Sequence, residues 1–525
     1  MKTSVLVLLV SWAFQIHAQE QSNELDVEHY ALHIELSNDH DTVFGVLEAT
    51  VNFSSDKNTF HLDLANTAQG KGMNVSQIKT KSGKKVRFSH SDNQLHITRT
   101  NTNATETYRI HYAGVPQTGL IIGKNKFNER TFFGDNWPNR AHHWFPCVDH
   151  PADKATMQFT VDAPKNYQCI ATGLKRDTQT LENGKTRHSF ASQLPLPTKV
   201  MVIGLAEFET QTLTHKHNFP IDIWAYKKDA ENGFTDMQVA TNVVDYFVAT
   251  IGTYPFEKLS NVQSTTQFGG MENAGNIFYD ENAINGRREM EALIAHEIAH
   301  QWFGNSASES DWKHLWLSEG FATYFTDLYF EHQYGTAAMN QRLEQERNKV
   351  LQFSKQYPHP VVDTSYTSLM QLLNPHSYQK GAWVLHMLRT KIGDSAFFNG
   401  IRTYYNTYKY SNASSIDFQK CMEESAQIDL NTFFNQWLHQ PHQPILQVEQ
   451  HTTTEHHTLV FEQLQESSVF TFELEIQLNY TDNTSEIKLF LISNQRQELD
   501  VNSTKEIESI QCDPNTKLLA QFLIL

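Results

Sequence analysis

Two histidines four residues apart, with a glutamate after the first, constrain the fold of this chain more than any other feature. They are His296 and His300, with Glu297 between them, in an apolar stretch whose spacing predicts a helix. Residues four apart project from the same face of a helix. Two imidazoles placed in this way can bind one metal ion, while the neighbouring carboxylate handles the proton of a water molecule.

A third ligand is available further along the chain, because eighteen residues separate His300 from Glu319. A tetrahedral catalytic zinc site takes three protein ligands and keeps one position open. The chain contains 26 histidines, so a chance His-Glu-x-x-His match has odds on the order of a tenth. A chance match would not also lie in a helical apolar pattern with an acid at a usable distance. We therefore predict a zinc site of His296, His300 and Glu319 rather than two ordinary helix histidines.

The size and charge of the chain narrow the classes of protein to which it can belong. At 525 residues it is long enough for about three to four domains with sizeable cores. Charged residues make up 19% and aromatic residues 12%, which is a globular rather than a disordered composition. The formal net charge of -17 argues against a general nucleic-acid-binding protein, which needs a basic surface.

The first 18 residues have the pattern of a cleavable signal peptide. Lys2 gives a positive start, residues 4–14 are almost entirely apolar, and residues 16–18 resemble a cleavage site. The apolar run is shorter than the roughly twenty residues that a membrane-spanning helix needs, and no later segment reaches that length. We therefore expect a secreted or periplasmic protein without a membrane span; a buried N-terminal strand is the alternative.

Four cysteines would be free to oxidise outside the cytoplasm. Cys147 and Cys169 lie in the same predicted domain and form the better candidate pair; the other two are Cys421 and Cys512. The sequence alone leaves their connectivity open.

The period of the apolar residues changes twice along the chain. Residues 19–215 mostly alternate polar and apolar, which predicts a large antiparallel β domain. Helical patterns dominate residues 216–440, the part that contains the metal ligands. Alternation returns after a boundary marked by prolines, and residues 441–525 are enough for one small β sandwich. The expected class is multidomain α+β, with a mostly helical domain between two β domains.

A pair of glycines, Gly269 and Gly270, follows the strand-like segment 261–264. Adjacent glycines let a ligand approach the backbone closely and leave N–H and C=O groups at a strand edge uncovered. An extended peptide could add to such an edge as a further strand. Glu272 would then offer its carboxylate to the free ammonium group of the peptide. The alternative interpretation is a turn whose glutamate is solvated.

The combination of these motifs resembles the gluzincin zinc aminopeptidases, the family of aminopeptidase N, aminopeptidase B and the leukotriene-hydrolysing enzyme. The His-Glu-x-x-His motif, the glutamate eighteen residues later and the preceding Gly-Gly-Met-Glu-Asn segment all match. Residues 144–151 resemble the family's Pro-Cys-x-Asp-x-Pro segment, residues 377–382 its Tyr-x-Lys-Gly segment, and residues 430–438 the end of its catalytic domain. The resemblance covers about residues 25–440 and implies a thermolysin-like, mostly helical catalytic domain.

The resemblance implies roles for the residues around the metal. His296, His300 and Glu319 would bind one Zn2+ ion per chain. Glu297 would act as general base toward the attacking water and then donate the proton to the leaving amine. Tyr378 would donate a hydrogen bond to the tetrahedral oxyanion, an interaction worth about 2.7–4 kcal/mol in the transition state. A core tyrosine at the start of a buried helix is the alternative for Tyr378.

The same resemblance assigns substrate binding to the glycine segment. Glu272 would bind the N-terminal ammonium group of a peptide, which restricts hydrolysis to the first peptide bond. Gly269, Gly270, Met271 and Asn273 would hold the peptide beside it. The implied protein is a secreted zinc metallo-aminopeptidase, a hydrolase that acts on peptides with a free N-terminus.

Three departures from the family pattern lead to further expectations. The family usually places a glutamine in the first domain, but the loop 135–140 has none, and Asn136 is the candidate substitute. Many relatives have a glutamate seven residues after the ligand glutamate, where this chain has Thr326 and then Asp327, so we expect support for the ligands from elsewhere. Relatives commonly end in a large helical domain, whereas this sequence stops after the β sandwich. We therefore expect an open site or one covered by a partner subunit.

Two other functions share parts of this pattern with peptide hydrolysis. The Gly-Gly-Met-Glu-Asn form also occurs in the leukotriene hydrolase branch, but that branch uses a basic carboxylate clamp in a helical C-terminal domain that this sequence does not contain. A peptide-binding protein with an inactive metal site would need neither Glu297 nor Tyr378. No charged residue that selects the first side chain of the substrate is identified, and the oligomeric state is left open.

Overall fold

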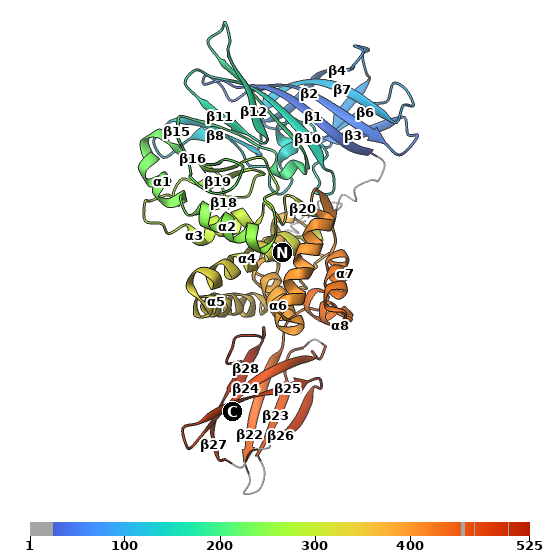
Figure 1. The fold of residues 1–525 in the computed structure, drawn as a ribbon. Coiled ribbons are helices and arrows are strands. Elements are labelled where there is room, and N and C mark those ends of the chain that lie inside the picture. The colour runs from blue at the N-terminus through green and yellow to red at the C-terminus, as the bar shows by residue number, and fades with distance from the viewer. Residues whose placement is uncertain (1–24, 453–456, 467, 502, 504) are drawn as a thin grey trace, which may run out of the picture.

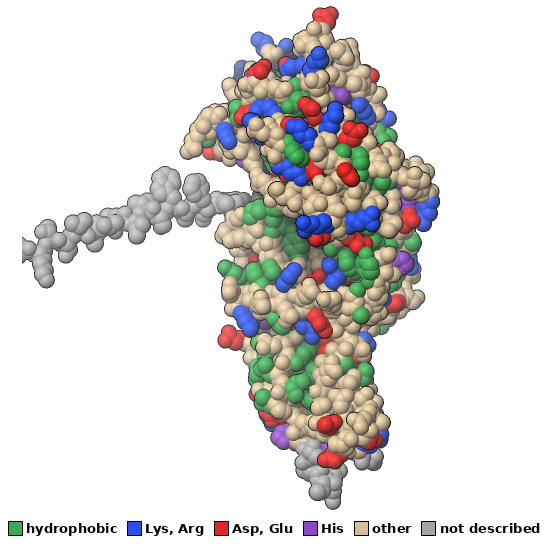
Figure 2. Space-filling view, turned by 90° about the vertical axis from the view of Figure 1, so that its left-hand side faces the viewer, with side chains coloured by type: hydrophobic (Ala, Val, Ile, Leu, Met, Phe, Trp, Pro, Cys, Tyr) green, Lys and Arg blue, Asp and Glu red, His purple; other side chains and the backbone are tan. Residues whose placement is uncertain are grey.

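A computed structural model describes residues 25–452, 457–466, 468–501, 503 and 505–525. The signal peptide expected at residues 1–18 lies outside these described residues. Three regions follow one another along the molecule in Figure 1: a large β region at the top, a helical region with a small sheet in the middle, and a smaller β region at the bottom. The fold class expected from the sequence is confirmed. Figure 2 shows the molecule turned by 90°, with acidic and basic side chains interspersed on that face.

The N-terminal region is built on a seven-stranded sheet with the order β12-β13-β10-β1-β2-β7-β4. Its strands are β1 (Leu25–Glu35), β2 (Val43–Phe53), β4 (Gly72–Thr80), β7 (Thr105–Val115), β10 (Ala155–Ala163), β12 (Leu174–Thr180) and β13 (Thr186–Leu196). Neighbouring strands are antiparallel except β1 and β10, which are parallel. Along β2, buried residues alternate with more exposed ones, as the two-residue period of the sequence predicts.

Two smaller sheets complete the N-terminal region, with the orders β3-β6-β5 and β11-β14-β9-β8. Their strands are β3 (Thr59–Asp63), β5 (Phe88–Ser91), β6 (Gln94–Thr98), β8 (Leu120–Lys124), β9 (Arg130–Gly134), β11 (Gln168–Ala171) and β14 (Ile203–Ala206). The 3-10 turn Thr198–Val200 leads into β14 and contacts the middle region, because the Ala274 N–H donates to the Val200 carbonyl at 3.2 Å.

The middle region contains a five-stranded sheet with the order β15-β16-β17-β19-β18. Its strands are β15 (Phe208–Thr212), β16 (Ile221–Tyr226), β17 (Leu259–Ser264), β18 (Gly270–Met271) and β19 (Asn276–Asp280). The three inner strands are parallel, and the two edge strands are antiparallel to their neighbours. One glycine of the predicted pair, Gly270, therefore lies in an edge strand of the sheet.

Helices form the rest of the middle region. They are α1 (Ala230–Met237), α2 (Ala240–Thr250), α3 (Glu291–Ala299), α4 (Trp316–Tyr334), α5 (Thr336–Ser354), α6 (Gly381–Tyr408), α7 (Ser415–Ala426) and α8 (Asn431–Phe434). Helix α4 contacts α2, α3, α5 and α6, and fourteen consecutive residues from its start are buried, so it is the central helix. The short strands β20 (Ala307–Glu309) and β21 (Ser411–Ala413) pair beside it. Within the described part of the chain, no helix is long and apolar enough to cross a membrane.

The C-terminal region is a β sandwich of two sheets, with the orders β26-β23-β22-β28 and β25-β24-β27. Its strands are β22 (Ile445–Thr452), β23 (His457–Gln463), β24 (Phe472–Tyr480), β25 (Ser485–Ile492), β26 (Arg496–Val501), β27 (Ile507–Cys512) and β28 (Gln521–Ile524). Every second residue of β24 is buried, so its apolar residues face the space between the sheets.

All four cysteines are free and buried, so the disulfide considered between Cys147 and Cys169 is not formed. The reason is their placement: Cys147 forms a β-bridge with Asp63, whereas Cys169 lies in β11 of a different sheet. Burial raises the pKa of the Cys169 thiol to about 12, which keeps it protonated.

Candidate active site

The three predicted metal ligands come together between two helices. His296 lies in the last turn of α3, His300 caps the end of that helix, and Glu319 lies in the first turn of α4. His296 Nε2 is 3.1 Å from His300 Nε2 and 3.3 Å from Glu319 Oε2, and His300 Nε2 is 3.2 Å from the same oxygen. Tetrahedral zinc with bonds of about 2.0–2.1 Å places its ligand atoms about 3.3–3.4 Å apart. The three donor atoms are close to that spacing, so these residues fit one zinc ion.

The His300 ring is oriented by contacts on the side away from its metal-binding atom. Its Nδ1 lies 3.1 Å from the Phe303 carbonyl oxygen and 3.1 Å from Ser318 Oγ. An imidazole whose Nδ1–H donates to a carbonyl presents the lone pair of Nε2 to the metal. The support that the sequence left unassigned comes, for this ligand, from Phe303 and Ser318.

The two residues at the position of the family's second glutamate have other partners. Thr326 Oγ1 donates to the Ala322 carbonyl of its own helix at 2.8 Å. Asp327 is fully buried and pairs with Arg342, with 2.6 Å between Asp327 Oδ1 and Arg342 Nε. Both side chains therefore serve the packing of α4 against its surroundings.

The candidate general base, Glu297, lies against the glycine strand. Its side chain is buried, and helix α3 contacts β18. A Cβ atom at position 270 would overlap the Glu297 carboxyl group, so the strand can come this close only because Gly270 has no side chain. The Glu297 carboxylate consequently lies beside the open sheet edge to which a peptide could add.

The candidate ammonium anchor, Glu272, follows directly after β18. Its residue is 4% exposed, and its Oε1 atom has no hydrogen-bond partner among the described residues. A buried carboxylate oxygen without a partner is unfavourable, so this position calls for a cationic ligand. Glu272 lies close to the candidate metal ligands, because its backbone carbonyl accepts a hydrogen bond from Gln301, the residue after His300, and its carboxyl group interacts electrostatically with His300 and Glu319.

The site concentrates negative charge in a buried space. Burial raises the pKa of the Glu272 and Glu297 carboxyls, although His300 opposes the rise in both. Burial also favours the neutral form of Glu319, but His300 and His296 hold the pKa of Glu319 below its usual range. Burial lowers the pKa of His300, yet the surrounding carboxylates raise it to about 10. The raised pKa values of Glu272, Glu297 and His300 mean that protons offset this negative charge when no metal is bound. A divalent cation would supply that positive charge instead.

Tyr378 faces the metal ligands from the π-helical turn His376–Lys380 that precedes α6. Its ring lies parallel to the His296 ring, with 5.9 Å between centroids and 8° between planes. Burial raises the pKa of Tyr378 well above its usual value, and the carboxylates of Glu319, Glu272 and Glu297 add to the rise. The phenol therefore keeps its proton and can donate a hydrogen bond, which an oxyanion donor must do.

The remaining residues of the predicted substrate segment are also placed by the structure. The Gly269 carbonyl accepts a hydrogen bond from the Asp280 N–H at 3.0 Å, which continues the pairing of β18 with β19. Asn273 is fully buried, and neither polar atom of its side chain has a partner among the described residues. Met271 is buried in an apolar cluster that includes Trp137 of the N-terminal region. Gly270 and Glu272 thus face the metal site, whereas the Met271 side chain joins the two regions.

The expectation that Asn136 replaces the family's glutamine is wrong. Asn136 is fully buried, and its Nδ2 donates to the carbonyls of Thr198 at 2.9 Å and Met201 at 2.6 Å. Its Oδ1 accepts a hydrogen bond from Trp144 Nε1 at 2.8 Å. Because all these polar groups are used inside the N-terminal region, Asn136 fixes that fold and has none left for a substrate.

Two residues that the sequence did not single out contact Glu272, the candidate ammonium anchor. The side-chain amides of Gln301 and Asn305 both donate to the backbone carbonyl of Glu272, at 2.8 Å and 2.6 Å. Both residues follow His300 within five positions, but only the metal motif drew attention to that stretch. The sequence offers one sign of their role: Gln301 and Asn305 are uncharged polar residues in an otherwise apolar segment, where a buried amide needs a hydrogen-bond partner.

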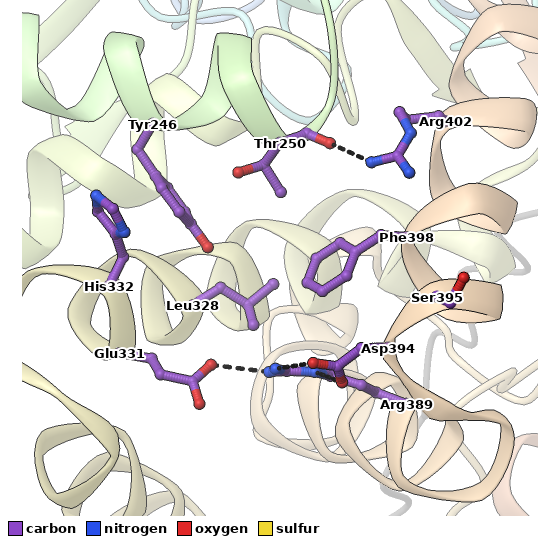
Figure 3. A pocket seen from close by; sticks show the side chains of 10 residues that line it. All are labelled: Tyr246, Thr250, Leu328, Glu331, His332, Arg389, Asp394, Ser395, Phe398 and Arg402. Carbon is purple, nitrogen blue, oxygen red and sulfur yellow. Dashed lines mark hydrogen bonds and ion pairs between the residues drawn. The ribbon is translucent and has the colours of Figure 1, made fainter.

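A separate cavity of about 520 Å³ lies among α2, α4 and α6. Figure 3 shows Tyr246 and Phe398 within it, and Arg389 at one side between Glu331 and Asp394. Arg389 forms an ion pair with each of these carboxylates at 2.8 Å. None of the predicted site residues lines this cavity, so it is distinct from the metal site.

Comparison with known proteins gives two family matches and several relatives. Residues 235–437 match the Peptidase family M1 domain, and residues 26–200 match the Peptidase M1 N-terminal domain.

Glutamyl aminopeptidase from Sus scrofa is 28% identical over 377 residues, which is 68% of this chain and 40% of that protein. Glutamyl aminopeptidase from Homo sapiens is 25% identical over 454 residues, 80% of this chain and 47% of that protein. Probable aminopeptidase 2 from Sulfurisphaera tokodaii is 28% identical over 398 residues, 72% of this chain and 50% of that protein. The chain spans about half the length of the curated relatives it matches.

Proposed function

Because the chain belongs to the M1 peptidase family, we propose that it is a zinc-dependent aminopeptidase that hydrolyses the N-terminal peptide bond of peptides. One observation carries the proposal: a buried carboxylate oxygen of Glu272, which has no hydrogen-bond partner among the described residues, lies after an edge strand whose loop is hydrogen-bonded to Gln301, the residue next to the candidate metal ligand His300. A metal site alone would suit any hydrolase of this type. The added anionic anchor favours substrates with a free ammonium group at their first residue.

Substrate binding follows from the edge strand and the anchor. The peptide adds to the free side of β18, where Gly270 keeps the backbone accessible. Its ammonium group pairs with Glu272 and gives the buried oxygen a partner that the described part of the chain does not supply. Since the chain of the substrate begins at that contact, the first peptide bond is the one that lies next to Glu297 and the metal ligands.

The chemistry is divided among the metal ligands, Glu297 and Tyr378. A zinc ion held by His296, His300 and Glu319 would lower the pKa of a water molecule that it binds from about 15.7 toward 7 and polarise the substrate carbonyl. Glu297 takes the proton of the attacking water and delivers it to the leaving amine. Tyr378 donates its hydrogen bond to the oxyanion that develops on the carbonyl oxygen.

The test is a panel of fluorogenic aminoacyl amides, each paired with its N-acetylated form and assayed with and without a chelator. We expect cleavage of the free amines, loss of activity in the chelator, recovery on adding zinc, and little cleavage of the acetylated forms. The panel includes a glutamyl substrate, because two of the relatives are named glutamyl aminopeptidases. Equal rates on acetylated substrates would indicate an endopeptidase, and activity indifferent to chelation would remove the proposed mechanism.

We further propose that the protein is exported through a cleaved signal peptide. The support is the positive start followed by an apolar run and a small-residue site within residues 1–18. N-terminal sequencing of the mature protein is expected to give a chain that begins at Gln19 and is recovered outside the cytoplasm. A cytoplasmic protein that begins at residue 1 would contradict this proposal.

A further inference from the structure

The backbone carbonyl of Glu272 accepts hydrogen bonds from two side-chain amides at once. Gln301 Nε2 lies 2.8 Å from this oxygen, and Asn305 Nδ2 lies 2.6 Å from it. Both donors are fully buried, as is the surrounding segment. Because both donors are buried, they restrict the position of the Glu272 backbone far more than contact with solvent would.

The side chain of Gln301 forms hydrogen bonds with the loop after β18 at two residues. While its Nε2 donates to the Glu272 carbonyl, its Oε1 accepts a hydrogen bond from the Gly275 N–H at 2.9 Å. Gln301 directly follows the metal ligand His300, so its backbone position is tied to the metal-binding helix. The amide therefore connects the loop that contains the ammonium anchor to the residue next to a metal ligand.

Asn305 is itself held by the N-terminal region. Lys154 donates from Nζ to the Ser306 carbonyl at 2.8 Å and to the Ser411 carbonyl at 2.7 Å, and it lies 3.4 Å from the Asn305 carbonyl. The Asn305 N–H also donates to the His300 carbonyl at 3.1 Å. Contacts thus run without interruption from the first region, through Asn305, to the backbone of Glu272.

We propose that Gln301 and Asn305 are positioning residues that set the distance between the ammonium-binding carboxylate of Glu272 and the metal ligands. This inference rests on the proposed aminopeptidase function and deepens it. The distance matters because it defines which bond of the substrate reaches the reacting groups, and a displacement of about 1 Å can cost about 100-fold in rate. Lys154 makes the N-terminal region part of this arrangement.

The chain offers a matched control with the same hydrogen-bond pattern elsewhere. Gln436 is buried, donates from Nε2 to the Thr471 carbonyl at 2.9 Å and accepts from the Thr471 N–H at 3.0 Å. This contact joins the middle region to the C-terminal sandwich and involves none of the proposed site residues. Replacing Gln436 should reveal the cost of losing a buried amide clamp without displacing the anchor.

The experiment measures recognition of an ammonium group without relying on turnover. Zinc-loaded wild type, Gln301→Met, Asn305→Leu and the control Gln436→Met are titrated by calorimetry with two matched thiol ligands, one with an amine on the carbon next to that of the thiol and one without. The thiol binds the metal in both ligands, so the ratio of the two Kd values reports the anchor alone. Zinc content and thermal unfolding are recorded for each protein.

We expect the wild type to bind the amino-thiol more tightly than the plain thiol. In Gln301→Met and Asn305→Leu, which we call the clamp variants, this preference should fall about 10- to 100-fold. Their affinity for the plain thiol and their zinc content should stay unchanged, while Gln436→Met should keep the full preference. A wild type that prefers the amino-thiol, together with clamp variants that keep the same ratio, would overturn the positioning role alone. A wild type that ignores the amine would instead overturn the proposed function.

The contribution of the N-terminal region is tested in the same titration with Lys154→Met. Its matched control is Lys126→Met, which removes another lysine of that region that donates to a carbonyl of the middle region, Glu281, at 3.0 Å. We expect Lys154→Met to lower the preference for the amino-thiol several-fold and Lys126→Met to leave it unchanged. If Lys154→Met and Lys126→Met give the same ratio of the two Kd values, the N-terminal region does not act on the position of Glu272.

Discussion

The two halves of the candidate site are held in different ways. In the metal half, His296 lies on α3 and His300, four positions later, caps the end of that helix, while Glu319 lies on the adjoining α4. In the substrate half, Glu272 lies in a loop after the two-residue edge strand β18, and its backbone is held by Gln301 from another segment. A helix supplies most of the geometry of the first half, whereas tertiary contacts supply that of the second.

This difference predicts which property of the protein a substitution in each half would impair. Two ligands on one helix keep their relative positions as long as the helix forms, so damage to the metal half should affect every substrate equally. A loop without its tertiary contacts takes many conformations, so damage to the substrate half should remove discrimination first. The following predictions use that contrast.

The largest effect is expected in the metal half, from Glu297→Gln. The amide keeps the shape of the side chain but cannot take a proton, so kcat should fall about 100- to 10,000-fold on every substrate. Zinc content, measured by atomic absorption, should remain at one ion per chain. Glu291→Gln on the same helix is the control, because that carboxylate accepts hydrogen bonds from Tyr329 and Tyr334 and has no contact with the candidate metal ligands among the described residues. Activity of Glu297→Gln close to that of the wild type would exclude Glu297 as the base.

Tyr378→Phe should produce the next largest effect. Loss of an oxyanion donor costs about 2.7–4 kcal/mol in the transition state, so kcat should fall about 100- to 1,000-fold with little change in KM. Steady-state kinetics on one good substrate provide the measurement. The control is Tyr404→Phe, whose hydroxyl is buried without a hydrogen-bond partner among the described residues. A change in KM alone would place Tyr378 in substrate binding rather than in catalysis.

Glu272→Gln separates the two halves most directly. Removing a charged hydrogen-bond partner costs about 1.5–3 kcal/mol, so kcat/KM for substrates with a free amine should fall about 10- to 150-fold. Substrates without the amine should be cleaved as by the wild type, which makes them the internal control. If both kinds of substrate lose activity in the same proportion, Glu272 supports the metal half and the contrast between the halves disappears.

The smallest effect on activity is expected from Asn136→Leu in the N-terminal region. The substitution removes the hydrogen bond that Asn136 makes with the Trp144 indole N–H and those it makes with the carbonyls of Thr198 and Met201, of which the Thr198 carbonyl still accepts from the Met201 N–H; the free energy of unfolding should fall by about 1–3 kcal/mol. Denaturant unfolding measures this loss. KM for free-amine substrates should not change at a temperature where the variant is folded. A raised KM with unchanged stability would return Asn136 to the substrate site.

Local periodicity explains most of what the sequence predicted correctly. The two-residue alternation in the first and last regions gives strands with one buried face, as in β2 and β24. Helical spacing around His296 gives α3, and a strand edge was expected at Gly270, where β18 lies. These features depend on neighbours in the chain, so a short window contains the necessary information.

The sequence by itself predicted which side chains could hold a metal ion, because a helix places residues four apart on one face wherever it forms, and the donor atoms of His296, His300 and Glu319 do lie together. Only the tertiary structure decided what holds the other side of the site. It assigned Asn136 to the interior of the first region, kept Cys147 apart from Cys169, and brought Gln301 and Asn305 to the carbonyl of Glu272. Such contacts join residues far apart in the chain, and their partners follow from how whole regions fold together rather than from any local pattern.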